Sequence, residues 1–255
     1  MEFREFYQWV YQRMGINLNS YKEVQLNRRI KSLMDRLNIK TLEEYKELLD
    51  KNKESRASFL DYITINVTEF FRNPEFFEVL GISLQEKFKS NIGELKIWSA
   101  GCSCGCEPYS LSMLIKEMSN DYKFKIYATD IDENMLSKAR LGKYTKIELR
   151  STENKYINKY FKKVNDEYIV LDNVKQNVNF RKHDMILDTY DTDFDLIVCR
   201  NVVIYFKDET KKQIIKGFID SLKVGGLLFV GATESISSYR EFGLEKLSPF
   251  IYRKV

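Results

Sequence analysis

The stretch LKIWSAGCSCGCEPYSLSMLIKEM, residues 95–118, decides the fold class of this 255-residue chain. Its first part, LKIWS (95–99), predicts a short buried strand, and its last part, EPYSLSMLIKEM (107–118), predicts a helix. A turn that contains Gly101 and Gly105 joins the two. A strand, a glycine turn and a helix in this order form the first part of a βαβ unit in a parallel sheet.

Strands and helices continue to alternate toward the end of the chain. The elements predicted by this pattern are strands at FKIYATD (124–130), FDLIVCR (194–200) and GLLFVGA (226–232), helices from Glu133 to Arg140 and from Glu209 to Leu222, and a closing hairpin from Leu244 to Arg253. Within residues 151–180, YIVLD (168–172) predicts a strand of a small β insertion, and NVNF (177–180) predicts a strand that rejoins the main sheet. The expected fold is α/β, with a doubly wound parallel sheet.

The first 60 or so residues predict helices instead. Between Tyr21 and Leu37, apolar residues recur at helical spacing, and basic residues dominate the rest of that helix. Thr41, followed by Glu44, resembles a capping box that opens a second helix. A further helix is expected from Ser55 to Ile65.

Composition restricts the possible functions. Hydrophobic residues make up 44% of the chain and charged residues 31%, which is enough apolar content for a packed core. No apolar run approaches the roughly 20 residues of a membrane span, and the start lacks a signal-peptide pattern, so we expect a cytoplasmic protein without membrane insertion. The 41 basic and 37 acidic residues nearly balance, which argues against nucleic-acid binding. A single histidine, His183, excludes a histidine-rich zinc site, and we expect it to be an ordinary loop residue.

Three of the four cysteines alternate within the glycine turn. Cys102, Cys104 and Cys106 suit neither a mutual disulfide nor a C-x-x-C metal knuckle at this spacing. A glycine turn is expected to direct successive side chains differently, and no fourth local ligand exists. We therefore predict no metal site, and a metal or iron–sulfur role remains only a competing hypothesis.

The turn and the next strand together favour a nucleoside ligand. Gly101 and Gly105 allow close approach of the backbone to a ligand, but G-x-G-x-x-G and the Walker lysine are both absent, which disfavours a pyrophosphate. Asp130, at the end of the second strand, is placed to accept hydrogen bonds from ribose hydroxyls. Glu107 would suit the ammonium of a methionine moiety. S-adenosylmethionine is the common ligand with these properties.

Four ordered blocks resemble the chemotaxis receptor methyltransferases, the CheR family. They are NVTEFFRNPEFF (66–77), WSAGCSCGCEPYS (98–110), ATDID (128–132) and CRNVVIYF (199–206), with a looser match at LLFVGATES (227–235). The resemblance implies methyl transfer from S-adenosylmethionine to glutamate side chains on the cytoplasmic helical bundle of chemoreceptors, leaving S-adenosylhomocysteine. It also implies a helical receptor-docking domain, residues 1–72, and a Rossmann-like methyltransferase domain, residues 73–255, with a β-subdomain at about 151–180. We expect a monomer.

The family's functional positions carry over to residues of this chain. The resemblance implies that the cofactor contacts are Asn66, Thr68, Arg72, Gly101, Glu107, Asp130, Asp184, Met185, Asn201 and Val202. Arg72 would contact the cofactor carboxylate or the incoming glutamate, and Asp184 and Met185 would lie where the adenine amino group is read. Transfer to an ionised glutamate needs no general base, so Arg72 and Tyr205 are expected to act as positioning groups in catalysis.

The basic helix near the amino terminus has two possible interpretations. Arg28, Arg29 and Arg36 either form a solvated face or, as the resemblance implies, dock the acidic receptor bundle. FKKVNDEYIVLD (161–172) lacks the R-G-x-G loop of relatives that bind a receptor pentapeptide, which predicts a pentapeptide-independent member.

Cys104 and Cys106 replace a threonine and a glutamate that are common in relatives. This departure motivates one alternative, an S-adenosylmethionine-binding regulatory module with weak or no transferase activity. A nucleic-acid substrate is another alternative, and the balanced charge argues against it.

Overall fold

The computed structural model describes residues 1–90, 93–119 and 121–255, which form two compact units. One unit comprises Met1–Asn66 with Tyr205–Gln213, and the other comprises Val67–Ile204 with Ile214–Val255. Residues 67–72, which the prediction assigns to the amino-terminal domain, belong to the second unit. A backbone hydrogen bond explains the difference, because the Phe70 N–H donates to the Glu148 carbonyl oxygen, within the second unit.

The first unit is all-helical in its amino-terminal part, as predicted. Its elements are α1 (Phe3–Met14), the 3₁₀ turn η1 (Leu18–Ser20), α2 (Glu23–Arg36), α3 (Leu42–Lys51) and α4 (Lys53–Thr64). The buried rings of Phe6, Tyr45 and Phe59 lie within about 6 Å of one another and join α1, α3 and α4. The Thr41 hydroxyl caps α3 by accepting from the Glu44 N–H, while the Glu44 carboxylate returns to the N–H of Lys40.

The second unit is built on a mostly parallel sheet with the strand order β6-β2-β1-β7-β8-β10-β9. The strands are β1 (Leu95–Ala100), β2 (Phe124–Asp130), β6 (Val178–Lys182), β7 (Phe194–Cys199), β8 (Leu222–Val230), β9 (Leu244–Ser248) and β10 (Ile251–Lys254). The first five pair in parallel, and β9 and β10 form the predicted antiparallel hairpin at one edge. The α/β prediction is confirmed.

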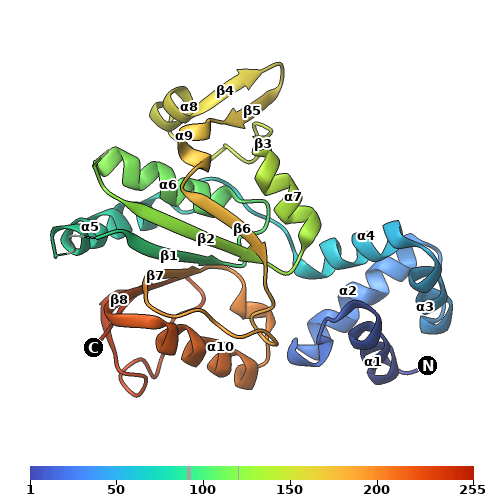
Figure 1. Cartoon of the computed structure of the whole chain (residues 1–255). Helices are drawn as coiled ribbons and strands as arrows, with labels where there is room; N and C mark the ends of the chain where they lie inside the picture. The colour runs from blue at the N-terminus through green and yellow to red at the C-terminus, as the bar shows by residue number, and fades with distance from the viewer. Residues whose placement is uncertain (91–92, 120) are drawn as a thin grey trace. The chain divides into compact units, whose positions relative to one another are not determined.

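Helices cover both faces of this sheet (Figure 1). They are α5 (Pro74–Ser90), α6 (Cys106–Met118), α7 (Glu133–Leu141) and α10 (Asp208–Ser221), and the 3₁₀ turn η2 (Val203–Tyr205) lies between β7 and α10 in the chain. Tyr109 of α6 packs on Phe180, with ring centroids 5.5 Å apart. Phe218 of α10 packs on Trp98, at 5.2 Å. Because Phe180 and Trp98 lie on opposite faces of the aligned strands, the sheet is doubly wound.

A small antiparallel sheet forms the expected β insertion. It comprises β3 (Lys143–Tyr144), β5 (Glu167–Val170) and β4 (Phe161–Val164), with α8 (Asn154–Tyr160) and α9 (Asp172–Lys175) beside it. The insertion thus includes Lys143 and Tyr144, earlier than the expected start at about residue 151, because β3 pairs with β5. β6 rejoins the main sheet as predicted. Among the described residues, no helix is both long and apolar enough to cross a membrane.

Candidate cofactor and substrate site

The predicted cofactor residues of the second unit gather at the carboxyl ends of four adjacent parallel strands. Gly101 follows β1, Asp130 ends β2, Asp184 follows β6 and Asn201 follows β7. β1 has β2 on one side and β7 on the other, so the strand order reverses at β1. Open α/β sheets bind their ligands in the crevice at such a point.

The glycine turn after β1 is held against the end of β2. The N–H groups of Gly101 and Cys102 both donate to the Thr129 carbonyl oxygen, at 2.8 and 2.9 Å. Gly101 has φ +78°, and a Cβ added to it would lie 2.6 Å from Cγ2 of Val202. The turn and Val202, both predicted to contact the cofactor, are therefore in close contact.

Asp130 is buried, with 8% of its surface exposed. Its carboxylate accepts from the Ser103 N–H at 2.7 Å and from the Asp132 N–H at 3.0 Å. Burial raises the pKa of Asp130 to about 6, although these hydrogen bonds oppose the shift. Each carboxylate oxygen has more than one lone pair, so the group can still accept from a ribose diol.

Glu107 lies in the first turn of α6 and points back toward β1. Its carboxylate accepts from the Ser99 hydroxyl at 2.8 Å and lies 3.9 Å from Nη1 of Arg200. The side chain is 14% exposed. Burial raises the pKa of Glu107, and the Arg200 guanidinium opposes that shift. A carboxylate that loses solvation in this way gains from a second cation, such as an ammonium group.

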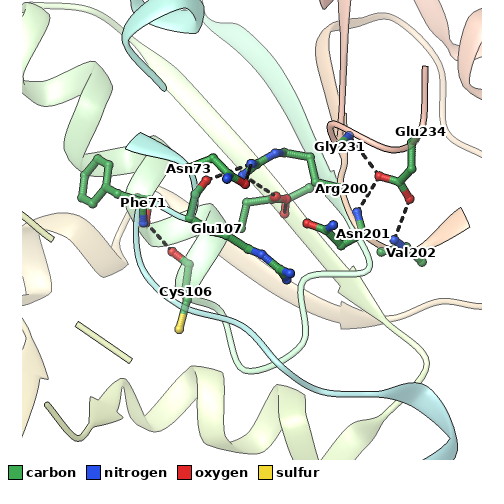
Figure 2. A network of polar contacts seen from close by, with 12 residues as sticks. Phe71, Asn73, Cys106, Glu107, Arg200, Asn201, Val202, Gly231 and Glu234 are labelled. Atoms are coloured by element: carbon green, nitrogen blue, oxygen red, sulfur yellow. Dashed lines mark hydrogen bonds and ion pairs between the residues drawn. The ribbon is translucent and has the colours of Figure 1, made fainter. Parts of the chain in front are cut away.

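Arg200 is a site residue that the sequence analysis missed. Its side chain is 2% exposed, and its Nη2 donates to the Arg72 carbonyl oxygen at 2.8 Å and to the Asn73 side chain at 3.1 Å. Figure 2 shows Arg200 between Asn73 and Glu107. The signal that could have pointed to it is its place directly after the buried strand β7, which ends at Cys199.

The backbone around Arg72 is held in an uncommon conformation. Phe71 and Asn73 both have positive φ, 51° and 59°. The Phe71 N–H donates to the Ser110 hydroxyl at 2.9 Å, and Nη1 of Arg72 donates to the Val67 carbonyl oxygen at 3.1 Å. Residues in this region cost free energy and persist where the surroundings fix them. The loop thus presents Arg72 in a fixed position.

Glu234 is a second residue that the sequence analysis missed. It is fully buried, and its carboxylate accepts four backbone N–H groups, those of Gly231, Asn201, Val202 and Val203 (Figure 2). The distances lie between 2.5 and 2.9 Å. Asn201 has φ 61°, so the carboxylate stabilises a turn that the chain would otherwise adopt with difficulty. The signal that could have pointed to Glu234 is the block LLFVGATES (227–235), which contains it and resembles the family loosely.

The cofactor contacts predicted for Thr68, Asp184 and Met185 remain predictions. Oδ1 of Asp184 accepts from the N–H groups of Ile186 and Leu187, so this carboxylate shapes its own turn, and burial raises its pKa. Met185 and Thr68 are half-buried. His183 follows β6 in a loop, as predicted, but it is 5% exposed and packs edge-on against Trp98.

Tyr205 and Asn66 belong to the first unit. The Tyr205 carbonyl oxygen accepts from the Lys22 N–H at 2.9 Å. Tyr205 also lines a groove of about 260 Å³ together with Arg28 and Arg29. The predicted positioning residue and two predicted docking residues thus share one groove of this unit.

The three predicted docking arginines differ in their surroundings. Arg28 is exposed. Arg29 donates to the Tyr62 carbonyl oxygen, and its guanidinium stacks on the Tyr62 ring, 4.4 Å from the centroid. Arg36 stacks on the same ring at 5.0 Å.

The cysteine side chains do not diverge as predicted. The sulfur atoms of Cys104 and Cys106 lie 3.7 Å apart, and all four cysteines are buried. The positive φ of Gly105, 88°, turns the chain so that both side chains point to the same side. The spacing predicts no mutual disulfide, and all four cysteines are free thiols.

Comparison with known proteins identifies the family. Residues 1–64 match the family model described as "CheR methyltransferase, all-alpha domain", and residues 66–250 match "CheR methyltransferase, SAM binding domain". The chain belongs to the CheR methyltransferase family. Its cofactor is S-adenosylmethionine.

Several curated relatives match over nearly the whole chain. A "chemotaxis protein methyltransferase" of Listeria monocytogenes is 37% identical, over 94% of this chain and 92% of the relative. "Chemotaxis protein methyltransferase 1" of Pseudomonas aeruginosa is 36% identical, over 99% and 97%. The Escherichia coli relative is 33% identical, over 92% and 84%.

The residues of the site fit this cofactor chemically. The cofactor supplies an activated methyl group on a sulfonium and carries an ammonium, a carboxylate and a ribose diol. Glu107 offers an anion for the ammonium, and Asp130 offers acceptors for the diol. Arg72, in the fixed loop, offers a cation for a carboxylate. Two partly desolvated carboxylates would repel phosphate, so the donor set favours a nucleoside without phosphates.

Proposed function

We propose that this enzyme methylates glutamate side chains of chemoreceptors and forms glutamate methyl esters on their cytoplasmic helical bundle. The observation that carries the proposal is that one unit brings Glu107, Asp130 and the loop of Arg72 together. Arg200 lies against both Glu107 and the Arg72 backbone, and the glycine turn after β1 is bonded to Asp130 at the end of β2. The names of the relatives, chemotaxis protein methyltransferases, support the substrate class.

The residues of the site act by alignment and by exclusion of water. A glutamate with an ordinary pKa of about 4.3 is ionised at neutral pH, so its oxygen can displace the methyl group directly from sulfur without a general base. Arg72 would orient a carboxylate, and Asn201, whose backbone N–H donates to Glu234, would contact the cofactor. Correct orientation of the nucleophile is worth several orders of magnitude in rate.

The basic groove of the first unit supports docking of an acidic helical surface. Exposed Arg28 lies beside Tyr205 and Lys22, and apolar Ile63 and Ile65 line the same groove. An amphipathic helix with acidic residues on one face has the chemistry that this groove complements. We further propose that the protein is a cytoplasmic monomer that does not depend on a receptor pentapeptide.

The test is transfer of a radiolabelled methyl group from S-adenosylmethionine to purified receptor cytoplasmic fragments. We expect alkali-labile label on the receptor, because methyl esters hydrolyse to methanol, and no label on a fragment whose acceptor glutamates are replaced by alanine. Calorimetry with S-adenosylhomocysteine runs in parallel. Binding without any transfer would support the alternative, a regulatory module, and failure to bind would remove the cofactor assignment to this site.

A further inference from the structure

Cys104 and Cys106 form a close pair of thiols in the glycine turn. Their sulfur atoms lie 3.7 Å apart, with Gly105 between them at φ +88°. A disulfide has an S–S bond of about 2.05 Å, so the sulfurs would need to approach by less than 2 Å. Among the described residues, no three or more side chains are grouped so that they could bind a metal ion.

The two thiols are chemically different. The hydrogen bond from Cys106 lowers the pKa of the Cys104 thiol, and Lys138 adds to this effect. Burial raises the pKa of the Cys106 thiol. Cys104 is 3% exposed and Cys106 is not exposed. The side chain of Lys138 is 43% exposed, so it is more accessible to solvent than either thiol. The lowered pKa favours Cys104 as the thiol that reacts first, with Cys106 as the resolving thiol.

The turn that carries the pair has little room to adjust. The Tyr144 hydroxyl donates to the Cys104 carbonyl oxygen at 2.6 Å. A Cβ added to Gly105 would lie 2.8 Å from the Ala139 Cβ, so α7 packs closely against the turn. If the two sulfurs approached each other, the backbone of Ser103 on one side and of Glu107 on the other would therefore have to shift.

We propose that Cys104 and Cys106 are a modification site, which a peroxide converts to a reversible disulfide that weakens cofactor binding. The Cys104 thiolate attacks a peroxide oxygen and the O–O bond breaks, which gives a sulfenic acid and, with hydrogen peroxide, one water. The Cys106 sulfur then displaces the hydroxyl group as a second water, so that two thiols and one peroxide give one disulfide and two waters. The loss of affinity rests on the proposal that this turn lines the cofactor site.

The experiment treats the full chain with hydrogen peroxide and follows two readouts. Intact mass should fall by about 2 Da, and a peptide containing residues 98–110 should carry the bond. The dissociation constant for S-adenosylhomocysteine, from calorimetry, should rise by about tenfold or more, since a displacement on the order of 1 Å has large effects at such sites. Dithiothreitol should restore both values.

Matched variants separate the possible outcomes. Cys104→Ala and Cys106→Ala each break the pair, so neither should lose about 2 Da or form the disulfide, and Cys106→Ala should stop at the Cys104 sulfenic acid, about 16 Da heavier. Cys199→Ala keeps the pair and should still form the disulfide. An unchanged mass of the wild type would overturn the proposal, as would a disulfide that leaves the affinity unchanged. If the reduced wild type does not bind S-adenosylhomocysteine but still forms the disulfide, the cofactor assignment fails and the modification site stands.

Discussion

Arg200 holds the backbone of Arg72, because its Nη2 donates to the Arg72 carbonyl oxygen at 2.8 Å. The same guanidinium lies 3.9 Å from Glu107, and its Cζ lies 5.4 and 4.8 Å from the rings of Phe77 and Phe229. Burial lowers the pKa of Arg200. One buried cation therefore connects the loop that carries Arg72 with the first turn of α6.

Arg200→Lys should weaken cofactor binding without unfolding the protein. Lysine keeps the charge but loses the planar fork that reaches the Arg72 loop and Glu107 together. The dissociation constant for S-adenosylhomocysteine should rise about tenfold to a hundredfold, as for loss of a buried charged hydrogen bond. Arg253→Lys, which alters an exposed ion pair with Glu245, is the control and should bind as the wild type does. Equal affinity of both variants would contradict the role of Arg200.

Arg72→Ala should nearly abolish methyl transfer and leave the fold intact. The Arg72 side chain is half-buried and donates a hydrogen bond to the Val67 carbonyl oxygen, so its removal should have little structural cost. Transfer to receptor fragments should fall by at least about a hundredfold, with an unchanged melting temperature. Arg181→Ala removes an exposed arginine paired with Asp191 and serves as the control. A folded and fully active Arg72→Ala variant would refute the assignment.

The fold was predictable because its strands are apolar segments bounded by glycine or acidic residues. The predicted strand at 124–130 coincides with β2, and the predicted helix at 209–222 is shifted by one residue from α10. The place of Gly101 and Asp130 at one edge of the sheet could also be predicted, since the parallel order places strand ends together.

Other features depend on tertiary contacts that no local pattern contains. Glu234 lies more than 30 residues from Asn201 in the chain, yet its carboxylate determines the conformation of the Asn201 turn. The convergence of Cys104 and Cys106 depends on the φ of a single glycine. β3 has two residues, too few for a period-2 pattern to be recognised.

Glu234→Gln should lower both stability and cofactor affinity. Each carboxylate oxygen of Glu234 accepts two backbone N–H groups. In glutamine, an amide NH2 group replaces one of these oxygens and would face two N–H donors. Each buried donor left unpaired costs about 1–3 kcal/mol, so we expect a loss of about 2–6 kcal/mol in the free energy of unfolding, measured by urea denaturation. Glu245→Gln, at an exposed ion pair, should cost less than about 1 kcal/mol. Similar losses in the two variants would show that the four hydrogen bonds contribute little.

Cofactor affinity should decrease as the pH falls through about 6. The pKa of Asp130 is raised to about 6 because the group is buried, so acid protonates it and removes acceptors for the ribose diol. Folding stability changes in the opposite direction. A raised carboxyl pKa in the folded state favours folding at low pH, and this contribution is lost as the pH rises from the ordinary value of about 4 to about 6. Calorimetry with S-adenosylhomocysteine between about pH 5 and pH 8 measures the first effect. Asp130→Asn should bind weakly with little pH dependence, and a dependence equal to that of the wild type would assign the titration to another group.

Charge reversal on the basic helix should separate docking from folding. Arg28 is exposed in the groove, so Arg28→Glu should lower kcat/KM for receptor methylation by about tenfold, while the melting temperature and S-adenosylhomocysteine affinity stay unchanged. Arg36→Glu should act in the same direction. Arg29→Glu should instead lower the melting temperature as well, because Arg29 donates to the Tyr62 carbonyl oxygen and stacks on the Tyr62 ring. Arg13→Glu, at an exposed arginine paired with Asp50 outside the groove, is the control. If Arg28→Glu methylates a dilute receptor as fast as the wild type, the basic face is only a solvated surface.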